Sequence, residues 1–194
     1  ERTSLVLRNF IRGFENALSD DACDNLIEWF KRDDHTGKTV EANRITRKDK
    51  QMWMSEDELL YPVLQKSKFD MLYEYIMEFP TVYRGGKKSL VSPESKIQRT
   101  NPMGGGFHNF HAENSHYADA TRALVWTIYL NDVPDGEGET EFLYEKIRVQ
   151  PRKGMGCIFP AAWMYQHRGN PVHTHPKYIA TGWYWYPLEK PISS

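Results

Sequence analysis

Two histidines and one glutamate, with a lysine close behind, are the residues of this chain best suited to metal chemistry. His111 and Glu113 stand two positions apart in the run FHNFHAEN, and His167 precedes Lys177 by ten residues in QHRGNPVHTHPK. Two imidazoles and one carboxylate can occupy one face of an octahedral Fe(II) ion and leave three positions open. A lysine shortly after the second histidine can hold the far carboxylate of a diacid that chelates the same metal. The spacing therefore predicts a metal site beside an anion site.

Strand periodicity explains how the first two residues can reach one metal. Side chains alternate faces along a strand, so residues two apart point the same way. His111 and Glu113 meet this condition if 110–114 is a strand. An isolated H-x-E pattern more often faces water, so the prediction of a metal site depends on the residues around it.

The same periodicity predicts a pocket wall. In the run KYIATGWYW, Lys177, Thr181 and Trp183 share one face, a combination that suits a ligand pocket better than a fully buried core. In the run RALVWTIYLN, the narrower face ends at Tyr129, whose hydroxyl is a natural second donor to a carboxylate held by Lys177. The ordinary alternatives are a solvent-facing lysine and aromatic side chains packed in a core.

The elements that must position these side chains form two halves of one domain. In the first half Ser19 is a predicted cap for a helix over 20–31, and Ser55 with Glu58 is a predicted capping box for a helical region that runs to about Phe79, with a break near Pro62. The apolar side chains of that second region are expected to cover a sheet: Leu64, Phe69, Leu72, Tyr73 and Ile76. A leading strand is expected over 4–11, and the polar stretch 32–50, with the basic residues Arg44, Arg47, Lys48 and Lys50, is interpreted as a solvated loop.

The second half has short strands separated by Gly, Pro, Asn and Asp, which is typical of a sandwich or barrel. The predicted strands are 96–100, 110–114, 122–131, 140–142, 147–150, 156–159, 167–172 and 178–186. The bulky residues Leu124, Trp126, Ile128 and Leu130 are expected to pack under the helices.

Composition sets broad limits on the class of protein. The 194 residues include 40% hydrophobic and 13% aromatic residues, which indicates a folded globular chain of one domain. A formal net charge of −1 gives no overall attraction to nucleic acid or to an anionic membrane, and no apolar run approaches the length of a membrane span. Two cysteines make no disulfide framework and lack zinc-site spacing, so an intracellular compartment is expected.

With these motifs in order, the second half resembles the iron(II)- and 2-oxoglutarate-dependent dioxygenases, particularly the prolyl-4-hydroxylase-like branch. The resemblance covers roughly 96–187 and follows an ordered series of motifs: GGG (104–106), H-x-E, YLND (129–132), GEGET (136–140), GMGCIFP (154–160), His167, Lys177 and GWYWY (182–186). It implies a double-stranded β-helix, a jelly-roll, cupin-like barrel, at 96–187, buttressed by the helices and lid segment of 1–95 in a single domain, 1–194.

The resemblance also implies roles for individual residues. His111, Glu113 and His167 would bind Fe(II), and Lys177 would bind the C5 carboxylate of 2-oxoglutarate with help from Tyr129 or Thr181. Trp183 would lie near the metal. The activity implied is hydroxylation of a substrate C–H bond by O2, with succinate and CO2 as coproducts.

The chain departs from that branch at two places. The branch usually has aspartate in the H-x-D motif, whereas this chain has Glu113, as do some members of the wider superfamily that act on free amino acids. A tyrosine common on the preceding strand is replaced by the run QRTNPM, so Asn101 or Arg99 is the expected source of a polar contact.

The substrate has two open possibilities. A peptidyl side chain, proline above all, is the first expectation, with the 32–54 segment and 161–166 as a lid or peptide groove; a free amino acid or other small molecule is the alternative. Candidate rim residues are Trp53, Arg99, Tyr144, Trp163 and Arg168. His108, His116, His173 and His175 are expected to lie at the surface or the rim rather than on the metal. A zinc-dependent hydrolase and a non-catalytic jelly-roll binding or structural protein are the competing classes.

Overall fold

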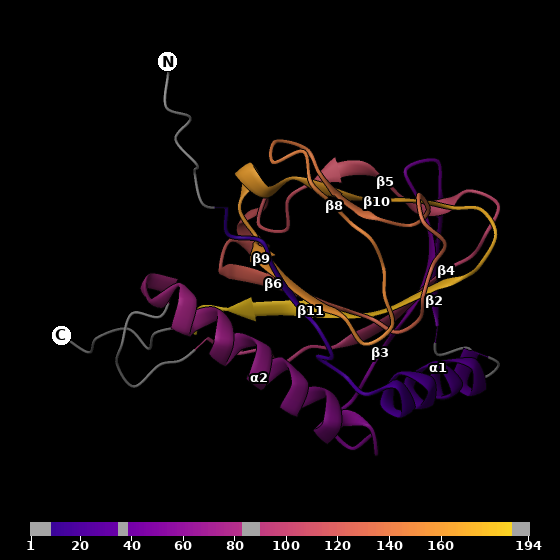
Figure 1. The fold of residues 1–194 in the computed structure, drawn as a ribbon, viewed down its shortest axis with the longest axis horizontal. Coiled ribbons are helices and arrows are strands. Elements are labelled where there is room, and N and C mark those ends of the chain that lie inside the picture. Colours follow the sequence, from indigo (N-terminus) through magenta and orange to yellow (C-terminus); the bar gives the residue numbers. More distant parts are fainter. Residues whose placement is uncertain (1–8, 35–38, 83–89, 188–194) are drawn as a thin grey trace.

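The computed structural model describes residues 9–34, 39–82 and 90–187, and in them one antiparallel sheet of 11 strands curls around an interior. Two helices lie together on one outer side of the curl, and the opposite side is formed by strands and loops (Figure 1). The strands follow each other across the sheet in the order β1-β9-β6-β11-β4-β3-β5-β10-β7-β8, with β2 paired to β3. The mostly β architecture predicted from the sequence is confirmed.

The elements have the following bounds along the chain: β1 Arg12–Phe14, α1 Asp20–Asp34, β2 Val40–Arg44, β3 Arg47–Trp53, α2 Tyr61–Glu78, the 3-10 helix η1 Pro80–Val82, β4 Lys96–Thr100, β5 Gly105–His111, η2 Tyr117–Asp119, β6 Arg122–Tyr129, β7 Thr140–Phe142, β8 Arg148–Val149, β9 Gly156–Pro160, η3 Trp163–Tyr165, β10 His167–Val172 and β11 Lys177–Trp185. The strand expected over 4–11 falls largely outside the described residues, and the first described strand begins after it, at Arg12.

Helix α1 forms where the sequence predicts it. The backbone N–H of Ala22 donates to Oγ of Ser19 over 3.3 Å, which satisfies one of the amides left free at a helix start. Asp20 and Asp21 lie in the first turn, where the helix dipole favours negative charge. Leu26 and Phe30 are fully buried, so this face of α1 packs against the sheet.

The predicted start of helix α2 is wrong. The helix begins at Tyr61 rather than after Ser55, and Pro62 lies in its first turn, where a missing N–H costs nothing. Ser55 and Glu58 instead form a backbone turn, and the Glu58 carboxylate accepts a hydrogen bond of 2.8 Å from Nε1 of Trp29. No capping box forms because Glu58 is engaged by α1.

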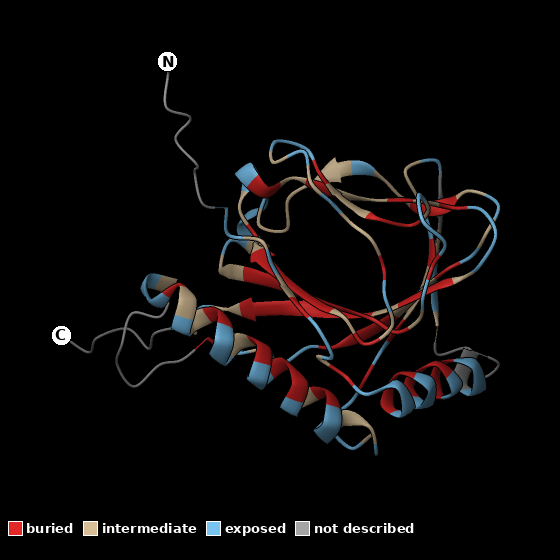
Figure 2. Ribbon diagram, viewed as in Figure 1, coloured by how far each residue is buried: buried red, intermediate tan, exposed pale blue. Residues whose placement is uncertain are grey.

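The predicted inner face of α2 is partly wrong. Leu64 is fully buried, but the side chains of Phe69 and Tyr73 are 68% and 58% exposed. The buried face instead carries Met71 and Tyr75. Helix α2 therefore presents aromatic side chains to solvent on the side away from the sheet, as its alternating colours show (Figure 2).

The hydrophobic core lies between the helices and the sheet (Figure 2). Leu124, Trp126 and Ile128 of β6 are almost completely buried in it, as predicted from their alternation. A second, smaller cluster occupies the inside of the curl and includes Val125, Phe159 and Trp183. One face of β6 therefore packs in the core under the helices, and the other face packs inside the curled sheet.

The polar stretch predicted as a loop is a β-hairpin. Strands β2 and β3 pair from Val40 opposite Gln51 to Arg44 opposite Arg47. Strand β3 also pairs with β4 and β5, so it completes the wall between them. The inward side of this hairpin faces a polar interior, which explains why its strands lack the hydrophobic alternation that would predict them.

Candidate active site

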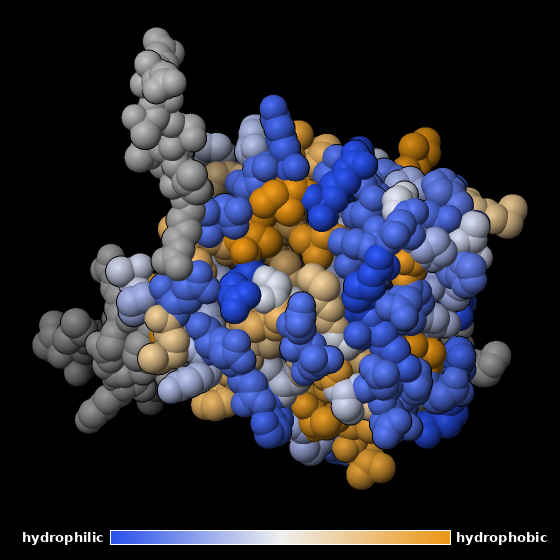
Figure 3. Space-filling view, viewed as in Figure 1, coloured by the Kyte–Doolittle hydropathy of each residue, from blue (hydrophilic) through white to orange (hydrophobic). Residues whose placement is uncertain are grey.

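A cavity of about 290 Å³ opens inside the curled sheet, and most of the residues predicted to do chemistry meet there. Figure 3 shows one surface of the molecule, where hydrophobic patches lie between hydrophilic side chains. The cavity is lined by Arg47, Lys96, Gln98, Thr100, Gly106, Phe107, His111, Glu113, Arg122, Val125, Thr127, Thr140, Phe159, His167, Arg168, Gly169, Asn170, Lys177, Ile179, Thr181 and Trp183.

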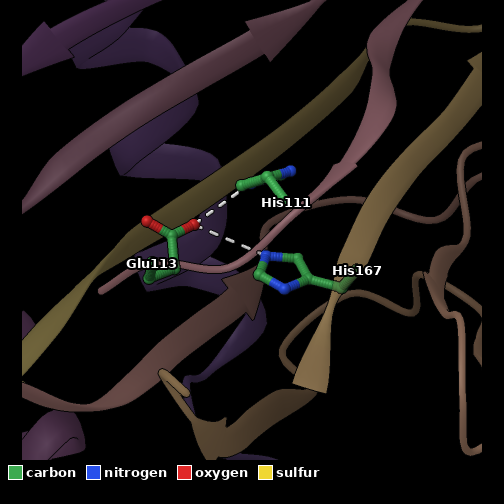
Figure 4. Close-up of side chains that lie close together, drawn as sticks. All are labelled: His111, Glu113 and His167. Atoms are coloured by element: carbon green, nitrogen blue, oxygen red, sulfur yellow. Dashed lines mark ion pairs between the residues drawn. The ribbon is translucent and has the colours of Figure 1, made fainter. Parts of the chain in front are cut away.

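His111, Glu113 and His167 converge in this cavity (Figure 4). Oε1 of Glu113 lies 3.2 Å from Nε2 of His111 and 3.5 Å from Nε2 of His167. One possible ligand atom from each residue lies within 4.8 Å of the others, and among the described residues this is the group of metal-ligating side chains found.

The backbone that presents Glu113 differs from the predicted strand 110–114. Strand β5 ends at His111, which is paired with His167 of β10, and Glu113 follows outside it. The amide of Glu113 donates to the carbonyl of Ala161 over 3.1 Å, and Nη1 of Arg122 donates to the Glu113 carbonyl over 3.0 Å. These long-range contacts, rather than strand alternation, bring the carboxylate to the histidines.

The two imidazoles are held through Nδ1, and each turns its Nε2 toward Glu113. Nδ1 of His111 lies 3.1 Å from the carbonyl of Asn109, and Nδ1 of His167 lies 3.1 Å from the carbonyl of Tyr165. A carbonyl only accepts, so each Nδ1 carries a proton. A proton on Nε2 can be donated to the Glu113 carboxylate, and a divalent metal would displace it and bind both nitrogens and the carboxylate oxygen. The three side chains therefore fit a divalent metal.

The Glu113 carboxylate is held in its ionised form. Burial alone would raise its pKa, but the hydrogen bonds and charges of His111 and His167 outweigh burial and hold the pKa well below its usual range. The other oxygen, Oε2, accepts a hydrogen bond of 3.0 Å from Nε1 of Trp183 and lies 3.7 Å from Nη1 of Arg122. Trp183 thus contacts the predicted metal ligand directly.

Lys177 lies at another part of the same cavity. Its side chain is buried, and Nζ donates a hydrogen bond of 2.6 Å to the carbonyl of Gly138. Burial lowers the pKa of Lys177 to about 8, because the ammonium has lost its water. Thr181 lines the cavity, and its hydroxyl donates to the carbonyl of Trp126 over 2.8 Å.

Tyr129 is placed near Lys177 but behind the cavity wall. Its hydroxyl lies 2.8 Å from Oγ1 of Thr140, and its ring centroid lies 5.7 Å from Nζ of Lys177. Thr140 lines the cavity and Tyr129 does not. The Tyr129 hydroxyl is therefore in contact with the residue that faces the cavity at this end.

Three of the other predicted contact residues lie away from the cavity lining. Asn101 is exposed, and the guanidinium of Arg99 lies 5.7 Å from the ring centroid of Phe30 in α1, on the helix side of the sheet. Trp163 is 66% exposed in η3. Arg99 alternates with Gln98 and Thr100 along β4, which explains why its side chain faces the other way.

The remaining rim candidates divide in the same way. Arg168 lines the cavity and pairs with Glu141 over 2.6 Å, whereas Tyr144 is 57% exposed beyond it. His116, His173 and His175 are exposed, and Nε2 of His108 is bound to the carbonyl of Gly104 over 3.1 Å. In the part of the chain that the structure describes, none of these four histidines joins the cluster of His111, Glu113 and His167.

Sequence reasoning missed three cations of the cavity. Arg47, Lys96 and Arg122 all line it, from β3, β4 and the start of β6. Lys96 shares strand parity with Gln98 and Thr100, and this alternation of polar residues was the available signal.

A model of the 2OG-Fe(II) oxygenase superfamily matches residues 95–185, the stretch from the start of β4 to the end of β11. No curated protein sequence matched the chain.

Solved structures share the fold at low sequence identity. A viral collagen prolyl hydroxylase from Paramecium bursaria Chlorella virus-1 is 22% identical, with a TM-score of 0.68, over 90% of this chain and 95% of that chain. A prolyl-4-hydroxylase from Pseudomonas putida is 18% identical, with a TM-score of 0.73, over 93% and 94%. A prolyl hydroxylase from Trichoplax adhaerens, in complex with a hypoxia inducible factor peptide, is 17% identical, with a TM-score of 0.73, over 96% and 88%.

Residues 95–185 therefore belong to the 2OG-Fe(II) oxygenase superfamily, and the resemblance seen in the sequence is confirmed. The protein is a 2-oxoglutarate-dependent dioxygenase that uses Fe(II), 2-oxoglutarate and O2. Among the described helices, none is both long and apolar enough to span a membrane.

Proposed function

We propose that this enzyme hydroxylates a C–H bond of a peptidyl side chain, with proline as the first candidate. The overall reaction converts substrate, 2-oxoglutarate and O2 into hydroxylated substrate, succinate and CO2. The observation that carries the proposal is the convergence of His111, Glu113 and His167 in a cavity that also contains the buried Lys177.

The proposed metal ligands are Nε2 of His111, Nε2 of His167 and Oε1 of Glu113. Their hydrogen bonds through Nδ1 and Oε2 hold the three side chains in the orientation that binding needs. Bound Fe(II) would supply the O2 chemistry, which no side chain of the cavity can perform.

The proposed cosubstrate anchor is Lys177, whose ammonium is suited to the C5 carboxylate of 2-oxoglutarate. An ammonium in a buried site binds a carboxylate strongly because little water competes for it. Thr181 and Thr140 offer hydroxyls on the same cavity wall, and Tyr129 orients Thr140 from behind.

Apolar and aromatic side chains would exclude water around the reacting centre. The ring of Phe107 stacks on His111 with centroids 3.8 Å apart, and the ring of Phe159 lies edge-on to His167 at 4.7 Å. Apolar packing against both histidines would limit side reactions at the metal and fix the planes of the two imidazole rings.

The peptidyl substrate is supported by the relatives in structure. The viral relative is named as a collagen prolyl hydroxylase, and the Trichoplax relative is bound to a peptide fragment. The sequence predicts a lid or peptide groove in residues 32–54. The β2–β3 hairpin lies in this segment and at the wall of the cavity, so it is the part proposed to contact a peptide. A free amino acid is the second candidate, because Glu113 replaces the usual aspartate.

The decisive experiment is anaerobic loading with Fe(II) followed by O2-dependent conversion of 2-oxoglutarate to succinate. Slow turnover without substrate is expected in the wild type and absent in His167→Ala, with exposed His175→Ala as a matched control that keeps it. Proline-containing peptides and free amino acids are then compared for stimulation of succinate formation and for gain of one oxygen atom by mass spectrometry. Stimulation by free amino acids alone would contradict the peptidyl proposal.

A further inference from the structure

Lys96 of β4 is a buried ammonium without a carboxylate partner. Its side chain lines the cavity and the residue is 8% exposed. Among the described residues, no carboxylate lies within salt-bridge distance of Nζ, and no hydrogen bond is made by it. The carboxylates of Glu113 and Asp49 attract its charge from beyond that distance, and the rings of Trp53 and Trp183 have their centroids 5.4 Å and 4.9 Å from Nζ.

These aromatic contacts leave the charge incompletely compensated. A cation above an indole is attracted by the ring, but the attraction recovers only part of the solvation that a buried ammonium loses. Burial accordingly lowers the pKa of Lys96 to about 8. A bound anion would supply the missing interaction.

The other cations of the cavity already have oxygen partners. These pairs are Arg47 with Asp49 at 2.6 Å, Arg168 with Glu141 at 2.6 Å, Arg122 with Asp119 at 3.0 Å and Lys177 with the Gly138 carbonyl at 2.6 Å. Lys96 differs from all of them, so a structural ion pair does not explain it.

Lys96 lies close to the proposed metal. Its partner ring, Trp183, donates a hydrogen bond to Glu113. Arg122 of β6, on the other side of β11, packs on the same indole, with its guanidinium carbon 3.7 Å from the ring centroid. A group bound by Lys96 would be held beside the reacting centre.

Lys96 and Lys177 are too far apart to hold the same carboxylate. Along β4, Lys96 is opposite Thr181 and Thr100 is opposite Lys177. Four residues of strand correspond to about 13 Å. The C5 carboxylate of 2-oxoglutarate at Lys177 therefore does not reach Lys96.

We propose that Lys96 binds a carboxylate of the primary substrate next to the carbon that is hydroxylated. This inference rests on the proposed function and narrows its substrate class. The carboxylate can belong to an acidic residue or the C-terminus of a peptide, or to a free amino acid. In each case the anion orients the substrate on the metal side of Trp183.

The test compares substrates that differ only in this charge. The pairs are a proline peptide with Glu or Gln beside proline, the same peptide with a free or amidated C-terminus, and L-proline or L-prolinamide. Succinate formation is measured with Fe(II), and the dissociation constant is measured separately with Zn(II) and 2-oxoglutarate, without turnover. We expect the carboxylate member of one pair to be favoured at least tenfold, and that pair identifies the source.

The variant Lys96→Met should abolish this preference, with a loss of about 10- to 100-fold for the acidic member and little change for the neutral member. Lys96→Arg should restore part of the preference. The matched control is Lys66→Met, which removes an exposed lysine from α2, outside the curled sheet, and should leave the preference intact. Equal use of both members by the wild type would overturn the proposal. Weaker binding of 2-oxoglutarate by Lys96→Met would also overturn it, because Lys96 would then serve the cosubstrate.

A separate readout distinguishes failure of this inference from failure of the proposed substrate. If succinate still forms slowly but no panel member stimulates it, the peptide and amino-acid substrates are wrong. Acetate is then titrated into reductively ¹³C-methylated protein loaded with Zn(II) and 2-oxoglutarate, with the Lys96 resonance assigned by its loss in Lys96→Arg. A saturable shift of this resonance supports the carboxylate site, and no shift overturns it.

Discussion

Nε1 of Trp183 donates a hydrogen bond of 3.0 Å to Oε2 of Glu113, although 70 residues separate them in sequence. The opposite oxygen, Oε1, faces the two histidines. The two oxygens of one carboxylate are thus divided between a structural contact and the proposed metal. Strand β11 thereby controls the orientation of a side chain that follows β5.

Replacing Trp183 by phenylalanine tests this division. Trp183→Phe keeps an aromatic ring but removes the donor, so the Glu113 carboxylate is free to rotate. We expect metal affinity to fall by about 10- to 100-fold, the usual cost of losing a group that orients a ligand. The dissociation constant for Fe(II) or Co(II), measured by competition with a chelator, provides the check. Unchanged affinity with a folded variant would show that the two histidines orient Glu113 without help.

Shortening the carboxylate tests the departure from H-x-D. The backbone around Glu113 is fixed by its bonds to Ala161 and Arg122, so Glu113→Asp cannot advance to replace the missing methylene. We expect weaker metal binding and slower succinate formation than in the wild type, by about tenfold or more. Glu113→Gln is the companion variant, since it keeps the length and removes the charge. If Glu113→Asp binds the metal with wild-type affinity, the backbone around residue 113 moves freely.

The pKa of Lys177 predicts how cosubstrate binding depends on pH. Burial lowers this pKa to about 8 in the free protein, and only the ammonium form attracts a carboxylate. The dissociation constant for 2-oxoglutarate should be flat below pH 8 and should increase about tenfold per pH unit above it. Calorimetric titrations across this range measure the slope.

Two variants separate the lysines in that experiment. Lys177→Met should bind 2-oxoglutarate weakly and without the slope, because the titrating group is gone. Lys96→Met should keep the slope, although the pKa of Lys96 is also lowered to about 8. Loss of the slope in Lys96→Met alone would reassign the cosubstrate anchor.

Close packing at Gly182 predicts a large effect on stability. A Cβ added there would lie 2.6 Å from the carbonyl oxygen of Glu94 and 2.9 Å from the Trp126 ring. We expect Gly182→Ala to lower the free energy of unfolding by about 1–3 kcal/mol, the usual cost of overpacking. Gly169→Ala is the matched control in a strand, since its added Cβ would have its nearest contact at 3.5 Å. Urea denaturation of both variants measures the difference.

Some parts of the fold could be predicted because local signals agreed. The bounds of β7 and β10 match the predicted strands 140–142 and 167–172, where turn residues lie before β7 and after β10. Helix α1 also matches, since a serine cap and an apolar face with helical spacing coincide. The β2–β3 hairpin was missed because β3 turns Arg47 and Asp49 toward a polar interior instead of a hydrophobic core.

The sequence by itself determined the chemistry of the site: the residue types of His111, Glu113, His167 and Lys177, and the order of motifs that relates them to one family. These are local properties, which a chain carries before it folds. Only the tertiary structure decided that Glu113 reaches the histidines from beyond the end of β5, and that Lys96 and Arg122 both contact the Trp183 ring. The physical reason is that strand pairing across the sheet, with its register and curl, sets which distant side chains meet, and no local pattern contains that information.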